Sequence, residues 1–416
     1  MLKYDEEVLP TKWYNVVPDL PEPLPPPLSR SQEGSSIELL NRIIPREMLR
    51  QEFSFNRYEN IPEEIRDLYR LVGRPTPLIR ANKLEEFLDY RGKIFLKYEG
   101  ATVTGSHKIN TAIPQAYYAS GESVSGVVTE TGAGQWGTAT TLAAALTGLH
   151  SKVFMVRVSY DQKPLRKTVM ALYGGEVVAS PSGETKFGRK MLEKDPQSTG
   201  SLGIAISEAV EYALDHDLKY MVGSVMNSVL SHQSIIGQET MKQLEIAGEE
   251  PQVMIGCVGG GSNFGGFVFP FISNEEIEMI ASTASEVPKF SMGKYDYDAM
   301  DTAGILPYVK MYSLGSDFIP PPIYSGGLRY HGAAPSLSIL VKSGRISSQE
   351  VEEMEVLAAL EIFARNTGIV AAPESGHAIA SAIRYAKDHR QGPKTVVLNV
   401  SGHGNFDLSI YGREVR

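Results

Sequence analysis

Short apolar runs rich in β-branched residues alternate with helical patterns from about residue 90 onward. Strands that are separated by helices along the chain are typical of parallel sheets with helices on both faces. The alternation therefore predicts an α/β protein built from open parallel sheets. The clearest predicted strands span residues 93–98, 126–129, 152–156, 253–258 and 395–400.

A helical pattern follows Ser347, and Glu350 stands three residues later. This spacing is typical of a capping box, in which the two side chains satisfy free backbone N–H groups of the first turn. We therefore predict a helix that opens at Ser347 and closes near Gly368.

Proline occupies six of the ten positions from Pro18 to Pro27. Because proline lacks an N–H group and restricts the backbone, this segment is predicted to be extended chain without helix or central strand. We interpret residues 1–36 as a proline-rich surface arm that packs on its own domain. A contact to a partner is the alternative.

Length and composition are those of a globular protein. A chain of 416 residues exceeds what one hydrophobic core usually supports, so two or three domains are expected. The net charge of −9 and the lack of a long basic run argue against binding to nucleic acid or to an anionic membrane. The single cysteine, Cys257, excludes an internal disulfide and a cysteine-based metal cluster.

Two features of the chain bear on its location. Asp5, Glu6 and Glu7 precede any apolar run, whereas a secretory signal needs a basic start and an apolar middle. No stretch of about 18 uninterrupted apolar residues is present to cross a bilayer. We expect a cytoplasmic protein.

Four predicted turns from a strand into a helix carry unusual residues, and open parallel sheets bind ligands at this end of their strands. The first turn contains His107, Lys108 and Asn110. A lysine among small and apolar neighbours loses water, which lowers its pKa and frees an amine for a Schiff base. Taken alone, Lys108 is more often a solvated surface residue and His107 a structural one.

The second turn consists of Gly259, Gly260, Gly261, Ser262 and Asn263. Three consecutive glycines let backbone N–H groups converge on an anion, and the start of a helix adds a favourable dipole. The spacing matches neither the dinucleotide fingerprint nor a P-loop, so a single phosphate fits better than a nucleotide. A tight turn without a ligand is the alternative.

The third turn places Glu130, a carboxyl group available for proton transfer, before a loop that could bind a carboxylate. That loop is Thr131, Gly132, Ala133, Gly134 and Gln135. An exposed glutamate before a capping loop is the alternative. In the fourth turn, the hydroxyl of Ser401 could meet a ring nitrogen. Together the four turns supply what pyridoxal phosphate (PLP) needs, namely a lysine, a phosphate cradle and a partner for the pyridine nitrogen.

From about Arg74 to its C-terminus, the chain resembles the tryptophan synthase β chain family. Trp136 and the proline-rich N-terminus resemble the divergent second type of this family. The resemblance implies a fold-type II PLP enzyme whose two α/β domains clasp the cofactor. It rests on motifs that stand in the family's order, namely His107 to Asn110, Glu130 to Gln135, Cys257 to Asn263, Pro373 to Ser375 with His377, and Ser401 with Gly402.

The resemblance assigns roles to these residues. Lys108 carries the cofactor and moves the α-proton, Glu130 is the second catalytic group, and Thr131 to Gln135 bind the carboxylate of L-serine. Because the hydroxyl of Ser401 does not keep the pyridine nitrogen protonated, the ring is a weaker electron sink, which suits loss of a β-leaving group. The residues implied to contact the cofactor are His107, Lys108, Asn110, Gly259, Gly260, Gly261, Ser262, Asn263, Glu374 and Ser401.

The resemblance also implies how the chain is divided. Residues 1–73 and 107–225 form an N-terminal domain with a mobile subdomain at about 123–216, and residues 74–106 and 226–416 form the cofactor-binding domain. A homodimer is implied, and an α chain is an expected partner. A monovalent cation held by backbone carbonyls is left open, since side chains do not reveal such a site.

The implied activity is PLP-dependent replacement of the L-serine hydroxyl by indole. Another fold-type II enzyme, such as a serine or threonine dehydratase or a cysteine synthase, is the nearest alternative, but a dehydratase needs no acid such as Glu130 beside indole. A non-catalytic partner subunit is the second alternative. Such a subunit has no chemical need to keep Lys108, Glu130 and Ser401 together.

Two positions depart from the main branch of the family. Arg329 stands where that branch has an aspartate, so we expect pocket closure and contact with an α chain to differ, the contact being weak or absent. Arg329 could also attract a donor with an extra negative charge, such as O-phosphoserine; threonine is left open as well. Trp136 replaces a histidine and changes the bulk beside the carboxylate loop.

Overall fold

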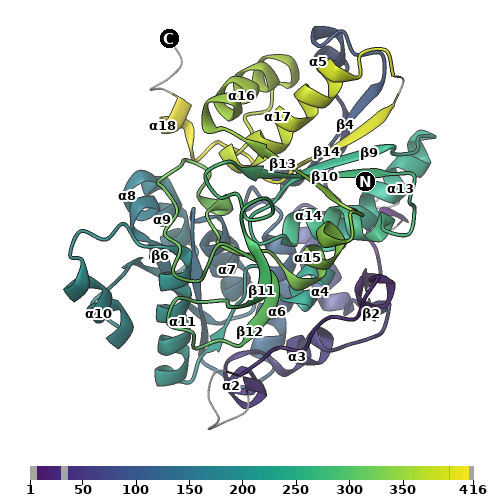
Figure 1. Cartoon of the computed structure of the whole chain (residues 1–416). Coiled ribbons are helices and arrows are strands. Elements are labelled where there is room, and N and C mark those ends of the chain that lie inside the picture. Colours follow the sequence, from purple (N-terminus) through teal and green to yellow (C-terminus); the bar gives the residue numbers. More distant parts are fainter. Residues whose placement is uncertain (1–6, 30–35, 393, 412–416) are drawn as a thin grey trace.

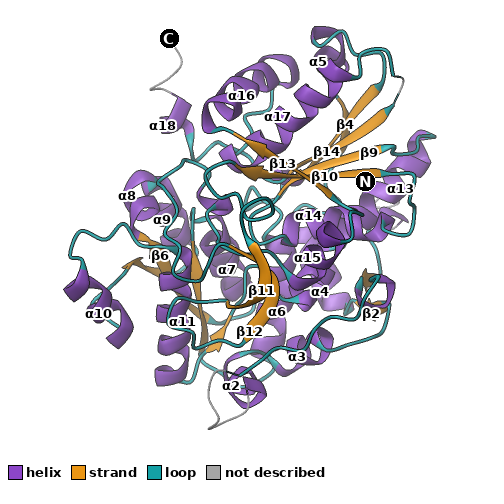
Figure 2. Cartoon of the chain, viewed as in Figure 1, coloured by secondary structure: helices purple, strands orange, loops and turns teal. Residues whose placement is uncertain are grey.

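The computed structural model describes residues 7–29, 36–392 and 394–411. Two mainly parallel sheets, one of six strands and one of four, carry helices on both faces (Figures 1 and 2). The predicted fold class is thereby confirmed. Asp5 and Glu6, and residues 30–35 of the proline-rich arm, lie outside the described residues.

The larger sheet has the strand order β13-β10-β9-β14-β4-β3, and β3 alone runs antiparallel to its neighbour. Successive residues of its central strands face opposite cores, as the alternation of side chains in a strand requires: Met254 packs into one core and Ile255 into the other. Its strands are β3 (Leu78–Arg80), β4 (Lys93–Tyr98), β9 (Val253–Cys257), β10 (Glu278–Ala284), β13 (Ser347–Val351) and β14 (Thr395–Val400).

Helices cover both faces of the larger sheet, so its strands are buried on two sides, which is why they read as apolar runs. One face carries α5 (Asn82–Phe87), α16 (Glu353–Thr367) and α17 (Pro373–Asp388). The opposite face carries α13 (Ile235–Ala247) and α14 (Ser262–Val268).

The predicted helix start at Ser347 is wrong. Ser347 opens the edge strand β13, in which it pairs with Ile280 of β10. Helix α16 begins only at Glu353, and it ends at Gly368, whose φ of +73° stops the helix as predicted. A capping pattern is local, whereas pairing with β10 is a long-range interaction, and here the pairing decides the conformation.

The smaller sheet is fully parallel and has the order β7-β6-β5-β8. Helices α7 (Gln135–Leu146) and α9 (Pro164–Leu172) contact it, as does α11 (Leu202–His216). The predicted strands at 126–129 and 152–156 are confirmed within longer ones. The strands are β5 (Gly126–Thr131), β6 (His150–Val156), β7 (Gly175–Ser180) and β8 (Lys219–Tyr220).

The remaining elements connect the two sheets or pack around them. The helices are α2 (Ser36–Ile43), α3 (Arg46–Glu52), α4 (Glu63–Leu71), α6 (Ile109–Ser120), α8 (Arg157–Gln162), α10 (Lys186–Lys194), α12 (Asn227–Gln233), α15 (Pro335–Lys342) and α18 (Leu408–Tyr411). Two antiparallel pairs join β1 (Lys12–Tyr14) to β2 (Tyr58–Asn60) and β11 (Lys294–Ala299) to β12 (Tyr308–Ser313). Single 3-10 turns lie at Val17–Asp19, Glu99–Ala101, Phe269–Phe271 and Gly326–Leu328.

The proline-rich arm packs on its own chain. Leu28 pairs with Tyr308 in a backbone bridge, and the Tyr297 hydroxyl donates a hydrogen bond to the carbonyl of Pro26. One detail of the prediction is wrong, because Pro18 lies within a 3-10 turn. Proline is tolerated at the start of a helical turn, where its missing N–H group would have no partner.

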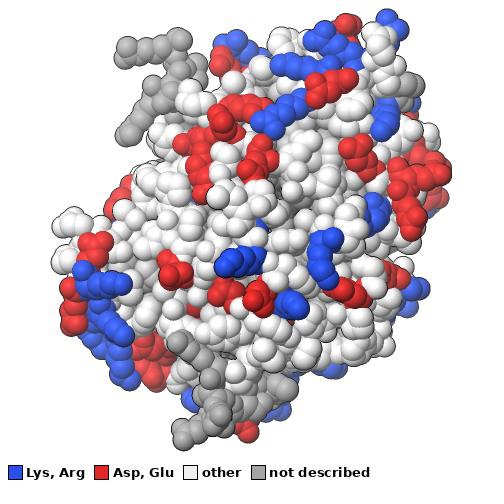
Figure 3. Space-filling view, in the orientation of Figure 1, with Lys and Arg blue, Asp and Glu red and all other residues white. Residues whose placement is uncertain are grey.

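The surface shows no segregation of charge on the face in Figure 3, where acidic and basic side chains are interspersed. Across the described ranges, the helices are too short or too polar to span a bilayer.

Candidate active site

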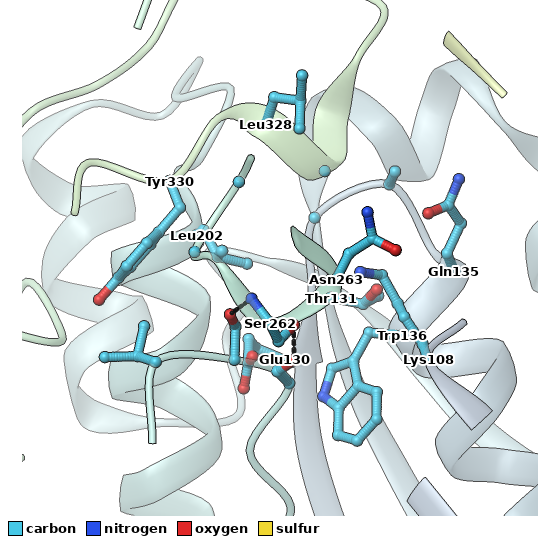
Figure 4. A pocket seen from close by; sticks show the side chains of 18 of the residues that line it. Lys108, Glu130, Thr131, Gln135, Trp136, Leu202, Ser262, Asn263, Leu328 and Tyr330 are labelled. Atoms are coloured by element: carbon cyan, nitrogen blue, oxygen red, sulfur yellow. Dashed lines mark hydrogen bonds between the residues drawn. The ribbon is translucent and has the colours of Figure 1, made fainter. Parts of the chain in front are cut away.

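A cavity of about 100 Å³ lies where loops from the two sheets meet (Figure 4). The larger sheet contributes the loops that follow its adjacent strands β4, β14 and β9, and the smaller sheet those after β5 and β8. The carboxyl ends of parallel strands meet at one edge of a sheet, and ligands bind there in open α/β folds. The four predicted turns all reach this cavity.

Lys108 stands at the start of α6 and faces the cavity. Part of its side chain remains accessible through the cavity, but protein surrounds the amine and desolvation lowers its pKa, against the opposing effect of the Glu374 carboxylate. His107 lies 3.4 Å away, from Nε2 to the lysine Nζ, and burial with the nearby Lys108 charge holds the pKa of His107 well below its usual value. A lysine with a lowered pKa is a competent amine nucleophile.

The glycine loop leaves no space for side chains. A Cβ atom at Gly259 would lie 2.2 Å from the Gly327 carbonyl oxygen, and one at Gly260 would lie 2.5 Å from the Ser224 Oγ. Gly261 has φ +108° and precedes α14, which has no side-chain cap. The Ser262 N–H at the start of α14 donates to the Ser224 Oγ at 3.2 Å, and the following N–H groups of this first turn receive no cap from Gly261, which suits an anion at the cavity wall.

Glu130 ends β5 as a buried carboxyl group on the cavity wall. Desolvation raises its pKa to about 7, and the Tyr220 hydroxyl opposes this rise by donating a hydrogen bond of 2.5 Å to Oε2. Tyr220 belongs to β8, which pairs with β5. At neutral pH this carboxyl group is poised between its acid and base forms.

Hydrogen bonds to the Thr131 side chain fix the conformation of the loop after Glu130. The Thr131 Oγ1 accepts hydrogen bonds from the backbone N–H groups of Gly134 and Gly137, both at 3.2 Å, so its hydroxyl hydrogen is free to donate. The Gln135 side chain donates to the Glu374 carboxylate at 3.1 Å, and Glu374 also accepts from the Gly327 N–H at 2.9 Å. Glu374 therefore ties the loop of one sheet to a segment beside the other.

Ser401 follows β14 and lines the cavity with its neighbour Cys257. Its Oγ lies 2.8 Å from the Ser375 Oγ, and the Cys257 thiol donates to it at 3.5 Å. Burial raises the pKa of Cys257 to about 11, which keeps the thiol protonated and the group neutral. Ser401 is thus a neutral polar group among neutral hydroxyl and thiol neighbours.

Most of the predicted site residues line the cavity together. They are His107, Lys108, Glu130, Thr131, Gly132, Ala133, Gln135, Trp136, Gly259, Gly260, Gly261, Ser262, Asn263, Glu374 and Ser401.

Three predicted site residues lie behind the wall. Asn110 is buried among ion pairs, where it accepts from Arg74 and donates to Glu99. Gly134 has φ +92° and turns the chain into α7. Arg329 donates a hydrogen bond of 2.5 Å to Ser159 of α8. Arg329 belongs to residues 326–334, which we call the pocket-closing segment.

Sequence reasoning missed several wall residues. Tyr220 carries no motif, and only its pairing position beside β5 brings it to Glu130. Ser224 accepts a hydrogen bond from the Ser262 N–H at 3.2 Å, yet its loop follows a strand of two residues that no pattern reveals. Ser375 belongs to the motif from Pro373 to Ser375, but that motif does not reveal its contact with Ser401.

A second cavity of about 580 Å³ adjoins the first and is mainly apolar. Residues 23–27 of the proline-rich arm form part of its wall. The two cavities share the side chains Tyr220, Val222, Val225, Met300 and Leu306.

Comparisons with a family model and with individual proteins of known name agree with each other. The model of the family "Pyridoxal-phosphate dependent enzyme" matches residues 69–402. The tryptophan synthase beta chain of Picrophilus torridus is 65% identical over 97% of each chain, and the tryptophan synthase beta chain 1 of Sulfurisphaera tokodaii is 57% identical over 98% of this chain and 97% of that one. The chain belongs to the tryptophan synthase β chain family of PLP-dependent enzymes. The resemblance drawn from the motifs is confirmed.

Solved structures agree on the fold. The serine racemase of maize superposes with a TM-score of 0.60 at 18% identity, over 84% of this chain and 98% of that one. At this identity the likeness extends to the fold alone.

The residues present fit PLP. A helix start behind three glycines without room for a Cβ suits a phosphate, and Lys108 faces the same cavity. The Ser401 hydroxyl suits a neutral pyridine nitrogen, because it can donate a hydrogen bond without charging the ring.

Proposed function

We propose that the protein makes L-tryptophan by replacing the hydroxyl group of L-serine with indole, in a reaction that depends on PLP. One observation carries the proposal: the buried carboxyl group of Glu130 shares a cavity with Lys108 and the glycine loop. Its pKa near 7 suits a group that both gives and takes a proton at neutral pH. The names and extents of the relatives support the same activity.

Three parts of the cavity would hold PLP. Lys108 would bind its aldehyde carbon, the loop from Gly259 to Asn263 would bind its phosphate, and Ser401 would face its ring nitrogen. When bound, PLP withdraws electrons from the α-carbon of the amino acid, which eases loss of the α-proton and of the group on the β-carbon. His107 and Glu374 would surround the ring, and Asn110 would support Lys108 from behind.

Lys108 and Glu130 would divide the proton transfers. The Lys108 amine takes the α-proton of serine and later returns it, and desolvation, which lowers its pKa, favours the neutral amine that acts as the base. Glu130 gives its proton to the departing hydroxide, which leaves as water. As a carboxylate, Glu130 then accepts the proton that indole loses, and the Tyr220 hydroxyl stabilises that charged form.

The two substrates would bind in the two adjoining cavities. The carboxylate of serine would bind the N–H groups of Thr131 to Gln135 and the Thr131 hydroxyl. The adjoining apolar cavity, which shares Leu306 and Met300 with the site, would admit indole. An apolar wall suits a flat aromatic substrate with one polar group.

A Glu130→Gln variant tests this assignment, with tryptophan measured from indole and L-serine. Removing the proton donor should lower tryptophan formation at least a hundredfold, while the PLP absorbance of the purified protein stays unchanged. A tryptophan rate close to that of the wild type would remove Glu130 from the mechanism. Pyruvate without tryptophan from the wild type would instead favour a dehydratase.

The charge and position of Arg329 indicate a second amino-acid donor for the same reaction. Arg329 is buried, desolvation lowers its pKa to about 10, and the carboxylates of Glu374 and Glu353 oppose this shift. A phosphate on the serine oxygen would add a negative charge for Arg329, which stands between Leu328 and Tyr330 of the cavity wall. Tryptophan formation with O-phospho-L-serine and with L-serine is measured for the wild type and for Arg329→Ala. A preference of the wild type for the phosphorylated donor that is absent in Arg329→Ala supports this role.

We also propose the domain division at residues 73, 106 and 225, with a mobile subdomain at about 123–216. The sheets support it, since β5 to β8 lie within residues 126–220 while the larger sheet takes its strands from residues 78–98 and 253–400. A homodimer in the cytoplasm, with at most weak contact to an α chain, completes the proposal. Light scattering of the purified protein tests the dimer.

A further inference from the structure

Lys289 is a fully buried lysine that meets backbone carbonyls. Its ammonium donates hydrogen bonds to the carbonyl oxygens of Gly259, at 2.7 Å, and Gly332, at 3.1 Å. Burial lowers its pKa to about 7, and no carboxylate within the described ranges pairs with it. Burying a cation without a counterion is costly, so this lysine calls for a physical reason.

Other buried lysines of the chain are arranged differently. Lys97 is equally buried, but it forms an ion pair with Glu239 at 2.7 Å. Lys219 donates to backbone carbonyls and also pairs with Glu122 at 3.0 Å. In the part of the chain that the structure describes, Lys289 thus differs from both because its ammonium meets carbonyl oxygens alone, without a carboxylate.

The two carbonyls bonded to Lys289 belong to two parts of the active site. Gly259 begins the glycine loop, and Gly332 lies in the pocket-closing segment 326–334. The same parts touch again where the Ala334 N–H donates to the Gly260 carbonyl at 2.9 Å. The ammonium therefore sits between the phosphate cradle and the segment that covers it.

Converging carbonyl oxygens repel each other unless a cation or a donor lies between them. An ammonium and an alkali ion meet this need in the same way, because both are monovalent cations and carbonyl oxygens are ligands for either. A lysine differs in being covalently attached and thus always present.

We propose that Lys289 is a positioning residue whose ammonium acts as a built-in monovalent cation, holding the glycine loop against the pocket-closing segment so that no alkali ion is needed. The inference rests on the proposed function in one respect, namely that the glycine loop binds the phosphate of PLP. The charged form is favoured by the two carbonyl dipoles that face it.

The wild-type protein provides the first test. PLP affinity, melting temperature and tryptophan formation are measured in potassium, sodium and tetramethylammonium chloride at equal ionic strength. We expect less than a twofold difference in affinity and rate among the salts, and equal melting temperatures. An increase of tenfold or more in PLP affinity with potassium would overturn the proposal.

Two substitutions provide the second test. Lys289→Ala removes the charge and leaves a space, whereas Lys289→Met removes the charge and fills the space. Both should weaken PLP binding at least tenfold, and potassium or ammonium ions should restore binding and melting temperature in Lys289→Ala but not in Lys289→Met. Lys342→Met, at an exposed lysine, is the matched control and should leave PLP binding unchanged.

The outcomes separate the two proposals. Wild-type PLP affinity in Lys289→Met, or a Lys289→Ala variant that no cation restores, would reduce Lys289 to a packing role and overturn the inference. If neither variant folds, the wild-type salt series still decides. Absence of tryptophan in every salt would overturn the proposed function alone, because PLP affinity and melting temperature report on Lys289 independently.

Discussion

Glu130 binds its proton more tightly in the folded chain than in the unfolded one, because burial raises its pKa from 4.5 to about 7. The folded state is therefore favoured by this group below pH 4.5, and that contribution is lost as the pH rises from about 4.5 to about 7. Relative to Glu130→Gln, the wild type should lose about 3 kcal/mol of unfolding free energy over this window. Denaturant titrations of both proteins between about pH 5 and pH 8, at the same PLP concentration, measure the difference. Parallel pH profiles would contradict the raised pKa.

Tyr220 adjusts the same pKa in the opposite direction. Its hydroxyl donates to the Glu130 carboxylate and so lowers the pKa that burial raises. In Tyr220→Phe the carboxyl group should titrate at a higher pH, so the basic limb of tryptophan formation should move upward. The pH dependence of kcat/KM for L-serine checks this shift, because Glu130 acts as the acid in the serine half of the reaction. An unmoved profile would show that the hydrogen bond does not act on the reacting form.

At the scale of single elements, the start of α14 depends on the conformation of Gly261. A side chain there would meet φ +108° and place Cβ 2.8 Å from Leu337. Gly261→Ala should therefore cost more stability than Gly248→Ala, where φ is +67° with open space and the strain alone costs about 1–2 kcal/mol. Melting curves compare the two variants, and PLP titration should show weaker binding in Gly261→Ala only. Equal PLP affinity in both would contradict the phosphate role of this loop.

The elements also show what the sequence could predict. Strands at 93–98 and 395–400 have their predicted bounds, because central strands buried on both faces leave short apolar runs such as Ile94 to Leu96 and Val396 to Leu398. The glycine loop was equally visible, since consecutive glycines have few structural uses. The helix start predicted at Ser347 is wrong because Ser347 pairs with Ile280 of β10, a contact that the local sequence does not reveal. Tyr220 stayed hidden because its place beside Glu130 depends on pairing between strands far apart in the chain.

At the scale of the whole molecule, a buried cluster of charges joins β4 to α13 and, through the hydrogen bond from Arg74 to Asn110, to α6. Arg74 and Lys97 pair with Glu99 and Glu239, and all four side chains have no exposed surface. Glu239→Gln leaves two buried cations short of a partner, which should cost about 3–5 kcal/mol. Glu245→Gln, in an exposed pair with Lys242, should change stability by less than about 1 kcal/mol. Thermal melting of both variants measures the contrast, and similar melting temperatures would show that the cluster does not hold these elements together.

The assembly of the site from both sheets is the feature that no single motif predicted. The cavity needs Lys108 and the glycine loop from one sheet and Glu130 from the other. Each motif can be recognised in the sequence alone. The distances between the motifs depend on how the two sheets pack, and contacts spread over the whole chain determine that packing.

Tryptophan formation from indole and L-serine, measured for the purified protein with PLP beside a Lys108→Ala variant, tests the central claim most directly. We expect tryptophan from the wild type only, with both proteins melting at similar temperatures. Tryptophan from Lys108→Ala at the wild-type rate, or none from a wild type that binds PLP, would contradict the claim.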